Sequence, residues 1–409
     1  MGRLEICEPG RGRNIRMSKE KIQSNISKIA YGCFYLAVII EVIIVLIDKS
    51  AYINPIEGSL FRLTFLLCLI KAVLTRYSLK EYLVMVLFLG LSMFTYFVTG
   101  RDEAVRIIVF VIACKDIDIK KCLKLVFYIT LIGTLLIVIL SMFGVGGAIA
   151  HTQYYGREGT TVETRYSFGM GHPNALHCMI WSLSVLYLYL YGATAKWQGY
   201  LAVAAINLFS FILTDSKTGL LVSVFSVLYA TIYRFVKTEW VKKICSLAGI
   251  IVTAGCIGIS VYFANQAYHV YNYDWSIDRG PIPTFLKKVD SMLTGRLREL
   301  VGTTRWEGTT QTWSLFSAPE NNYFFDLGWV RMFYWYGIIP ACIFIGVLFA
   351  VMIFCYRKRY YMAMMLMVSF AVYTVVEAHA VSVYLARNYV LFLIGGCWST
   401  MLCGEKNEE

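Results

Sequence analysis

Charged residues are scarce in this chain. Only 16% of its 409 residues are Asp, Glu, Lys or Arg, whereas a soluble globular domain carries about 25%. Hydrophobic residues make up 58%, and the mean hydropathy is +0.60. Apolar runs recur at lengths near the roughly 20 residues that cross a bilayer as a helix. The composition therefore excludes an ordinary soluble domain and predicts a polytopic membrane protein.

Cysteine spacings typical of metal sites and disulfide frameworks are also missing. The twelve cysteines include no CxxC pair, and most lie within hydrophobic runs. None lies between Ala264 and Gly328, the longest polar stretch. The polar loops expected on the outer face of the membrane show no Asp-x-Asp motif or Asp/Glu/His cluster of the kind that holds a divalent ion. We therefore expect neither a metal ion nor any other cofactor.

Positive charge exceeds negative charge, but its distribution does not indicate nucleic-acid binding. The net charge of +12 comes from short Lys and Arg clusters that separate apolar runs, and such clusters mark the cytoplasmic loops of membrane proteins. They predict cytoplasmic tails at residues 1–28 and 405–409 and an external segment at 264–328. The first 28 residues are basic and polar, so we expect no cleavable signal peptide.

The predicted fold class is all-α, a membrane helix bundle in residues 29–404. We expect about twelve transmembrane helices, with the 264–328 external loop before the last three. The predicted spans are 29–47, 59–75, 81–98, 101–114, 122–143, 173–192, 197–213, 218–236, 244–263, 329–354, 360–380 and 384–403.

One polar motif lies at the N-terminal end of the sixth predicted span. The decapeptide RYSFGMGHPN at 165–174 gathers Arg165, His172 and Asn174 within ten residues. Pro173 suits the first turn of the following helix. His172 is a candidate general base or a helix-capping residue, and Asn174 is a candidate ligand for substrate or a helix cap.

Basic residues also occur at helix ends that are predicted to face away from the cytoplasm. Lys and Arg are usually concentrated on the cytoplasmic side, so these residues run against the normal distribution. Each could extend toward lipid headgroups, but together they favour a binding site for an anion. This group consists of Arg62, Arg106, Arg165, Lys217, Arg331 and Arg387, with Arg296 and Arg305 in the large loop.

The 264–328 loop contains an expected amphipathic helix at 283–301. Gly302 follows this helix as a stop signal. The apolar residues recur at spacings of three and four, and they are Phe285, Val289, Met292, Leu293, Leu297 and Leu300. The opposite, polar face is expected to carry Lys287, Lys288, Asp290 and Arg298. The loop is also rich in aromatic residues, including Trp306 and Tyr323. These are candidate platforms for sugar rings or ordinary membrane-interface anchors. A loop of this length is usually functional.

Several segments, taken in order, resemble the Wzy-type polysaccharide (O-antigen) polymerases within the O-antigen polymerase/ligase family. The resemblance covers roughly residues 100–400. The segments are RxxxGxGHPN at 165–174, DSKTG at 215–219, LTGR at 293–296, YFFDLGW at 323–329 and GII at 337–339.

The resemblance implies a glycosyltransferase of the bacterial cytoplasmic membrane. Such an enzyme joins oligosaccharide repeat units carried on undecaprenyl pyrophosphate into capsular, O-antigen or exopolysaccharide chains. It implies a lipid-linked oligosaccharide and membrane lipid as partners, with a flippase and a chain-length regulator as further candidates.

The resemblance also assigns roles to residues. Arg165, Lys217 and Arg296 take the cationic positions that hold the pyrophosphate, and Asp326 takes an acidic position. Lys217 stands where Arg is common, and Leu327 and Trp329 stand where Asn and Tyr often do. The only loop histidine, His269, lies near the start of the loop, which favours a polymerase over the ligase branch.

The chemistry needs a base as well as cations. Arginine can neutralise a pyrophosphate leaving group, while the acceptor hydroxyl must lose a proton. The candidate bases are His172, Asp326, Glu320, Glu163 and His379. The remaining candidate substrate-binding residues are Asn174, Arg305, Trp306, Tyr323, Arg331 and His379.

Other functions remain open at this point. A flippase or exporter fits the number of spans, but transporters often contain two similar halves and no internal repeat is evident here. A chain-length regulator generally needs few spans. A ligase or another lipid-dependent transferase shares the expected chemistry.

Overall fold

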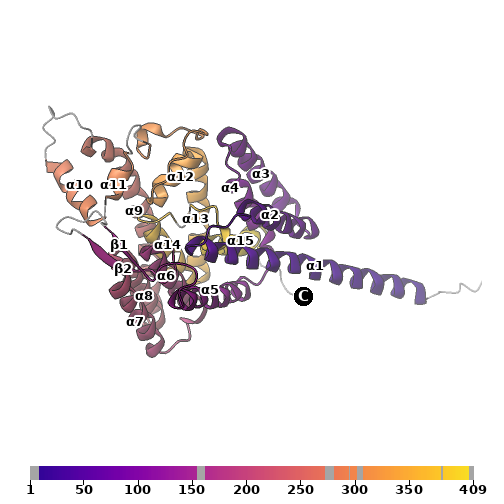
Figure 1. The fold of residues 1–409 in the computed structure, drawn as a ribbon. Coiled ribbons are helices and arrows are strands. Elements are labelled where there is room, and N and C mark those ends of the chain that lie inside the picture. Colours follow the sequence, from indigo (N-terminus) through magenta and orange to yellow (C-terminus); the bar gives the residue numbers. More distant parts are fainter. Residues whose placement is uncertain are drawn as a thin grey trace, which may run out of the picture.

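The computed structural model describes residues 9–153, 162–271, 281–293, 295–301, 307–378 and 381–404. It describes the backbone alone for residues 9–21 and 281–283. Within these ranges the protein is a bundle of α-helices with one small β-hairpin (Figure 1).

The helices follow the predicted segments closely in sequence. They are α1 (Pro9–Lys49), α2 (Glu57–Leu74), α3 (Leu79–Thr99), α4 (Glu103–Ala113), α5 (Ile119–Met142), α6 (Pro173–Tyr191), α7 (Trp197–Thr214), α8 (Lys217–Phe235), α9 (Glu239–Tyr271), α10 (Pro281–Met292), α11 (Arg296–Glu299), α12 (Gly328–Tyr336), α13 (Ile338–Lys358), α14 (Tyr361–Thr374) and α15 (Tyr389–Cys403), with short 3₁₀ turns η1 (Thr310–Thr312) and η2 (Leu385–Arg387).

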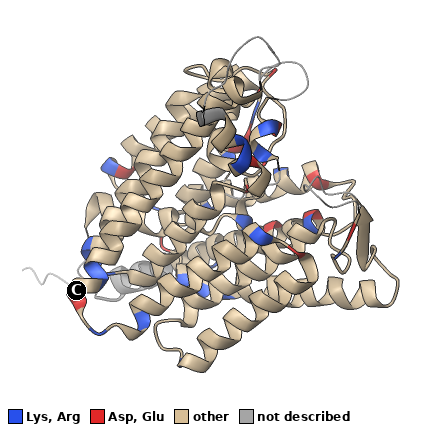
Figure 2. Ribbon diagram, turned by 90° about the vertical axis from the view of Figure 1, so that its left-hand side faces the viewer, with Lys and Arg blue, Asp and Glu red and all other residues tan. Residues whose placement is uncertain are grey.

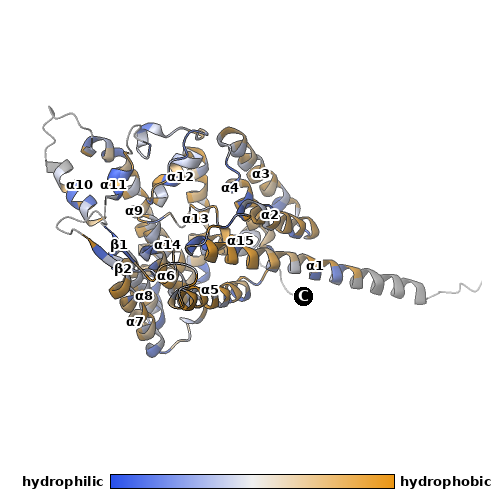
Figure 3. Cartoon of the chain, in the orientation of Figure 1, coloured by the Kyte–Doolittle hydropathy of each residue, from blue (hydrophilic) through white to orange (hydrophobic). Residues whose placement is uncertain are grey.

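Seven helices in the described part of the chain are long and apolar enough to cross a membrane. They are residues Ile22–Lys49 of α1 together with α3, α5, α7, α8, α9 and α13. The all-α membrane bundle is thus supported, whereas twelve spans are not confirmed. The bundle helices are mostly hydrophobic, while α10, α11 and the segment before α12 are more polar (Figure 3). Long stretches of helix carry no charged residue (Figure 2).

Helix α14 lies at the centre of the bundle. It packs against α6, α8, α9, α13 and α15, and its residues from Ala363 to Thr374 are buried except Val372. A helix that is hydrophobic on every side belongs in such a position. The residues after α14 therefore emerge beside several other helix ends.

We call this end of the bundle the site end. It is where α1, α5, α7 and α14 finish and where α6, α8 and α15 begin. Strand β1 (Ala150–Gln153) and strand β2 (Glu163–Tyr166) form an antiparallel hairpin here, with His151 opposite Arg165. The sequence pattern did not predict this hairpin.

The single predicted span over 329–354 is wrong. Helices α12 and α13 meet at Gly337, whose φ is +95°. A Cβ at this position would lie 2.6 Å from the Cα of Phe316. Beyond the break, the Ile338 and Ile339 amides donate to the carbonyls of Ser314 and Leu315, so the preceding segment packs against the break.

The expected amphipathic helix at 283–301 is also interrupted. It forms α10 and α11, separated by Leu293–Gly295, and Gly295 has a φ of +83°. Phe285 and Met292, expected on the apolar face, are exposed. Asp290, expected on the polar face, is buried because its carboxylate accepts backbone hydrogen bonds from α11.

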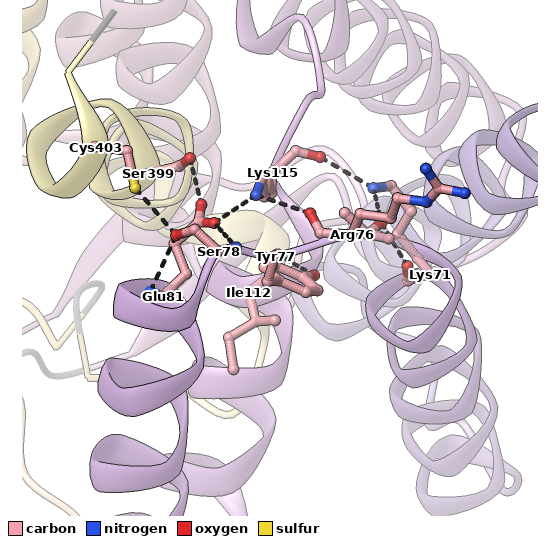
Figure 4. A network of polar contacts seen from close by, with 10 residues as sticks. Lys71, Arg76, Tyr77, Ser78, Glu81, Ile112, Lys115, Ser399 and Cys403 are labelled. Atoms are coloured by element: carbon pink, nitrogen blue, oxygen red, sulfur yellow. Dashed lines mark hydrogen bonds and ion pairs between the residues drawn. The ribbon is translucent and has the colours of Figure 1, made fainter. Parts of the chain in front are cut away.

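A buried polar network joins helices at the opposite end (Figure 4). Lys115 Nζ lies 2.7 Å from Glu81 Oε2, and Lys71 Nζ donates to the Lys115 carbonyl at 3.0 Å. Ser399 on α15 donates to Glu81 at 2.6 Å. Lys71 is buried, so its ammonium group is paired inside the bundle.

Candidate functional site

Arg165 is the residue that ties the hairpin to the helices. It is 5% exposed, and its Nε donates to the Thr214 carbonyl at 2.5 Å. Its Nη2 donates to Asn174 Oδ1 at 2.9 Å. Strand β2 thereby contacts the end of α7 and the first turn of α6, where free backbone carbonyls and polar side chains are available.

His172 caps α6, and Asn174 does not. The Nδ1 atom of His172 accepts a hydrogen bond from the Asn174 amide at 3.1 Å. Burial lowers the pKa of His172, and the positive charge of Arg165 lowers it further. The Nδ1 lone pair is thus engaged with the helix backbone, which makes His172 a poorer candidate for a general base than the sequence suggested. Asn174 instead orients Arg165. We call Arg165, His172 and Asn174 the hairpin cluster.

Arg296 is the centre of a second cluster. It is 3% exposed; its Nη2 lies 2.7 Å from Glu377 Oε1, and its Nε lies 3.6 Å from Asp326 Oδ2. Glu377 follows α14, and Asp326 precedes α12. We call Arg296, Asp326 and Glu377 the carboxylate cluster. It brings together three segments that are distant in the sequence.

Asp290 holds the short helix that carries Arg296. Its carboxylate accepts hydrogen bonds from the backbone amides of Leu297 at 2.6 Å and Arg298 at 3.3 Å. Tyr271, at the end of α9, donates its hydroxyl to the same carboxylate. Leu297 is fully buried. Arg296 is therefore presented from a fixed turn, because the free amides at the start of α11 are satisfied.

The two clusters act on each other electrostatically. The positive charges of Arg165 and Arg296 both lower the pKa of His172, while the negative charge of Asp326 raises it. His172 therefore lies within the field of both clusters. The fold has brought Arg165 and Arg296 into one charged region at the site end.

Two carboxyl groups in this region have unusual acidity. Burial raises the pKa of Glu377 to about 7, and the negative charge of Asp326 acts in the same direction. Arg296, Lys49 and Arg387 oppose this shift. Glu299, on α11, is exposed at the surface, but partial desolvation and the negative charge of Asp326 likewise raise its pKa to about 7. Perturbed groups of this kind concentrate at functional sites.

Lys217 does not join either cluster. It is exposed at the first position of α8, and its side chain makes no hydrogen bond or ion pair with the residues that the structure describes. Arg106, one of the expected outer cations, is also placed differently: it is buried and lies 3.3 Å from Glu41 Oε1. Because it is paired inside the bundle, Arg106 is not available as a surface anion ligand.

Arg331 lies beneath an aromatic strip before α12. It is 3% exposed, donates to the Phe325 carbonyl, and stacks 3.7 Å from the centre of the Phe324 ring. Tyr323 is at the exposed end of this strip, and its carbonyl accepts a hydrogen bond from Trp335 at 3.1 Å. Asp326 follows this strip directly in the sequence.

Among the other predicted site residues, Arg305, Trp306 and His379 lie outside the described residues.

Glu377 is the main residue that the sequence did not identify as part of the site. The signal was a carboxylate at the end of an apolar span, which is costly unless it is paired. Its partners Arg296 and Asp326 were both candidates, but nothing in the sequence indicated that they would meet at Glu377.

An apolar cavity of about 270 Å³ lies between α3, α4, α13 and α15. Its lining extends from Met332 and Tyr336, near the site end, to Met401 and Leu402, near the opposite end. The lining is almost entirely hydrophobic, as expected for a space that accommodates a hydrocarbon chain.

No group of three or more metal-binding side chains occurs in the portion that the structure describes. Comparisons of the chain with protein-family models, curated proteins and solved structures find no match. Function must therefore be inferred from the chain's own residues.

Proposed function

We propose that this protein is a membrane glycosyltransferase that polymerises oligosaccharide repeat units carried on undecaprenyl pyrophosphate. The product would be a capsular, O-antigen or exopolysaccharide chain. The site end would face outward from the bacterial cytoplasmic membrane, with both termini in the cytoplasm. The resemblance of the ordered motifs supports this family, and the local chemistry supports the reaction.

The observation that carries the proposal is the shared electrostatic region of Arg165 and Arg296. These residues are 131 positions apart in sequence, yet both influence His172. A pyrophosphate leaving group gains negative charge as its bond to sugar breaks, and arginine is permanently charged and can donate two parallel hydrogen bonds. Two such residues held on rigid elements can stabilise that charge.

Arg165 and Arg296 have different neighbours, which suggests that they stabilise the pyrophosphate charge in different ways. Arg165 is held by the Thr214 carbonyl and Asn174, so its guanidinium is oriented before substrate binds. Arg296 is compensated by Asp326 and Glu377. A bound pyrophosphate would compete with these carboxylates for Arg296, which makes Arg296 the cation whose pairing changes on binding.

The apolar cavity supports a lipid-linked donor. A polyprenyl chain is apolar along its whole length, and the cavity lining is apolar from one end of the bundle toward the other. Exposed Tyr323 and Phe324 are suited to sugar rings, because aromatic faces stack on their apolar sides. These features fit a donor with a hydrocarbon tail and a carbohydrate head.

A gene deletion tests this proposal in cells. Cells without the protein should accumulate single repeat units on the lipid carrier and lose the long surface polymer. Reintroducing the wild-type chain should restore the polymer ladder. Long polymer in the deletion strain, or loss of the lipid-linked unit itself, would contradict the proposal.

A further inference from the structure

Glu377 occupies a position suited to removing a proton near the proposed leaving group. It emerges at the end of α14, its side chain is 18% exposed, and it contacts Arg296 at 2.7 Å. It is therefore adjacent to the cation assigned to the pyrophosphate while remaining partly accessible. A base beside a leaving-group cation is the arrangement needed when an acceptor hydroxyl attacks as the leaving group departs.

The other candidate bases that the structure describes are less suitable. His172 uses Nδ1 to cap α6, so accepting a proton there would break the cap. A base for this reaction must lie beside the cation that holds the leaving group. The described ion pairs of Arg296 are with Asp326 and Glu377, and not with Glu163 or Glu320. Asp326 is close to Arg296, but its separation of 3.6 Å makes the ion pair looser than that of Glu377.

We propose that Glu377 is the general base that deprotonates the acceptor hydroxyl, with Asp326 as a positioning residue that tunes it. This inference rests on the proposed polymerase function. The acceptor hydroxyl transfers its proton to the Glu377 carboxylate, and its oxygen forms a bond to the anomeric carbon of the donor sugar. The bond from that carbon to the pyrophosphate oxygen breaks, and the pyrophosphate keeps the electron pair. Protonated Glu377 then releases its proton to water.

Arg296 couples donor binding to this base. In the structure it neutralises Glu377 directly. When a pyrophosphate draws the guanidinium toward itself, Glu377 loses positive charge from its surroundings and its proton affinity increases. The carboxylate thus becomes a stronger base when the donor is in place.

The groups facing Glu377 come from several elements. Asp326 adds negative charge, and burial disfavours the ionised form, so together they raise the Glu377 pKa to about 7. Cations on three other elements lower it. A base with a pKa near the working pH is efficient, because it is partly ionised and still binds the proton strongly. The charged groups around it are Arg296 on α11, Asp326 before α12, Lys49 at the end of α1 and Arg387 in η2. Glu299 on α11 and Arg331 on α12 also interact with Glu377 electrostatically.

The sign of the pH dependence follows from the need for an ionised carboxylate. Polymerisation should fall below about pH 7 as Glu377 becomes protonated. Replacing Asp326 by Asn removes the neighbouring negative charge, so the Glu377 pKa falls and the acid limb of the profile moves to lower pH. Glu299→Gln is the matched control, because Glu299 acts on the region from α11 and should shift the limb less.

The test uses full-length protein and a purified lipid-pyrophosphate-linked repeat unit. Glu377→Gln should reduce the rate about a hundredfold or more, and its residual activity should lack the acid limb. Glu377→Asp should recover part of the rate. Glu377→Gln should still bind the donor at least as well as wild type, because a competitor for Arg296 has been removed.

The outcomes separate the two proposals. Wild-type protein that does not polymerise at any pH contradicts the proposed function itself. Active wild type with a Glu377→Gln rate within threefold overturns the base assignment. A slow Glu377→Gln variant that has lost donor binding, or an acid limb that does not move in Asp326→Asn, would also overturn it by indicating a structural role.

Discussion

Arg296 and Glu377 are 81 positions apart in the chain, and their side chains form an ion pair at 2.7 Å. The pair joins the short helix α11 to the end of the central helix α14. Removing either partner would leave a buried or half-buried charge without its compensation, which is costly. The pair therefore connects the stability of the large loop to the electrostatics of the proposed site.

Substitution of the two central arginines should separate catalysis from packing. Arg165→Ala and Arg296→Ala should each reduce polymerisation about a hundred- to thousandfold, the usual cost of removing one transition-state donor. Arg→Lys should recover only part of this, because lysine keeps the charge but cannot make two parallel hydrogen bonds. Polymer length on gels from cells lacking the native gene gives the measurement.

Both arginines are buried, so folding must be checked in parallel. Expression and thermal unfolding in detergent should remain near wild type for the Lys variants. Arg357→Ala is the matched control, since Arg357 is an exposed arginine near the end of α13 and is not among the predicted outer cations. Near-normal polymer from both Ala variants, or a loss equal to theirs in Arg357→Ala, would contradict the assignment.

Polymerisation should not require a divalent metal ion. Arginine guanidinium groups can neutralise a pyrophosphate leaving group in the way that Mg²⁺ does elsewhere. The measurement is the rate of polymer formation in EDTA with the purified lipid-linked unit. Loss of activity that Mg²⁺ or Mn²⁺ restores would show that the arginines are not sufficient.

Gly337 should be far less tolerant of substitution than Gly346. Gly337→Ala places a Cβ at 2.6 Å from Phe316 Cα and imposes a positive φ on alanine, whereas a Cβ at Gly346 meets no atom within 4 Å. Gly337 has a ψ of 172°, and this combination with a positive φ is a region that essentially only glycine adopts, so alanine there costs roughly 1–3 kcal/mol. Gly337→Ala should therefore lower the midpoint of thermal unfolding clearly, while Gly346→Ala leaves it unchanged or slightly higher. Equal midpoints would contradict this account of the α12–α13 break.

The predicted orientation can be tested by labelling single cysteines. Glu320 and Thr238 are exposed on segments before α12 and α9. A membrane-impermeant thiol reagent added to intact cells should modify Glu320→Cys and spare Thr238→Cys, after the exposed Cys342 and Cys403 are replaced. The reverse pattern would place the candidate site on the cytoplasmic side and contradict the proposed function.

The helical architecture was largely predictable, because long apolar segments carry a strong signal. The breaks inside helices were harder to predict. Helix α12 ends at Gly337, where the backbone passes so close to Phe316 that a side chain would not fit. A hydropathy pattern carries no information about such a tertiary contact. Similarly, α10 and α11 separate because the Asp290 side chain turns inward to cap the second helix, although its position in the sequence suggested the polar face.

The site was predictable in part. Arg165, Arg296 and Asp326 were named from motif order, and the fold gathers them at one end of the bundle. Lys217 satisfies the same motif but remains exposed, since a sequence match does not fix the direction of a side chain. Glu377 was missed because its role depends on the tertiary contact with Arg296. The capping role of His172 depends on local backbone geometry at the start of α6.

The most direct test of the central claim is reconstitution of the reaction. Purified protein in lipid nanodiscs would be supplied with a single repeat unit linked to undecaprenyl pyrophosphate, without nucleotide sugar. The proposal predicts a ladder of products increasing by one repeat unit, together with release of one undecaprenyl pyrophosphate for each linkage, and loss of both in Arg165→Ala. A fully folded wild-type protein that leaves the repeat unit unchanged, or a ladder unaffected by Arg165→Ala, would contradict it.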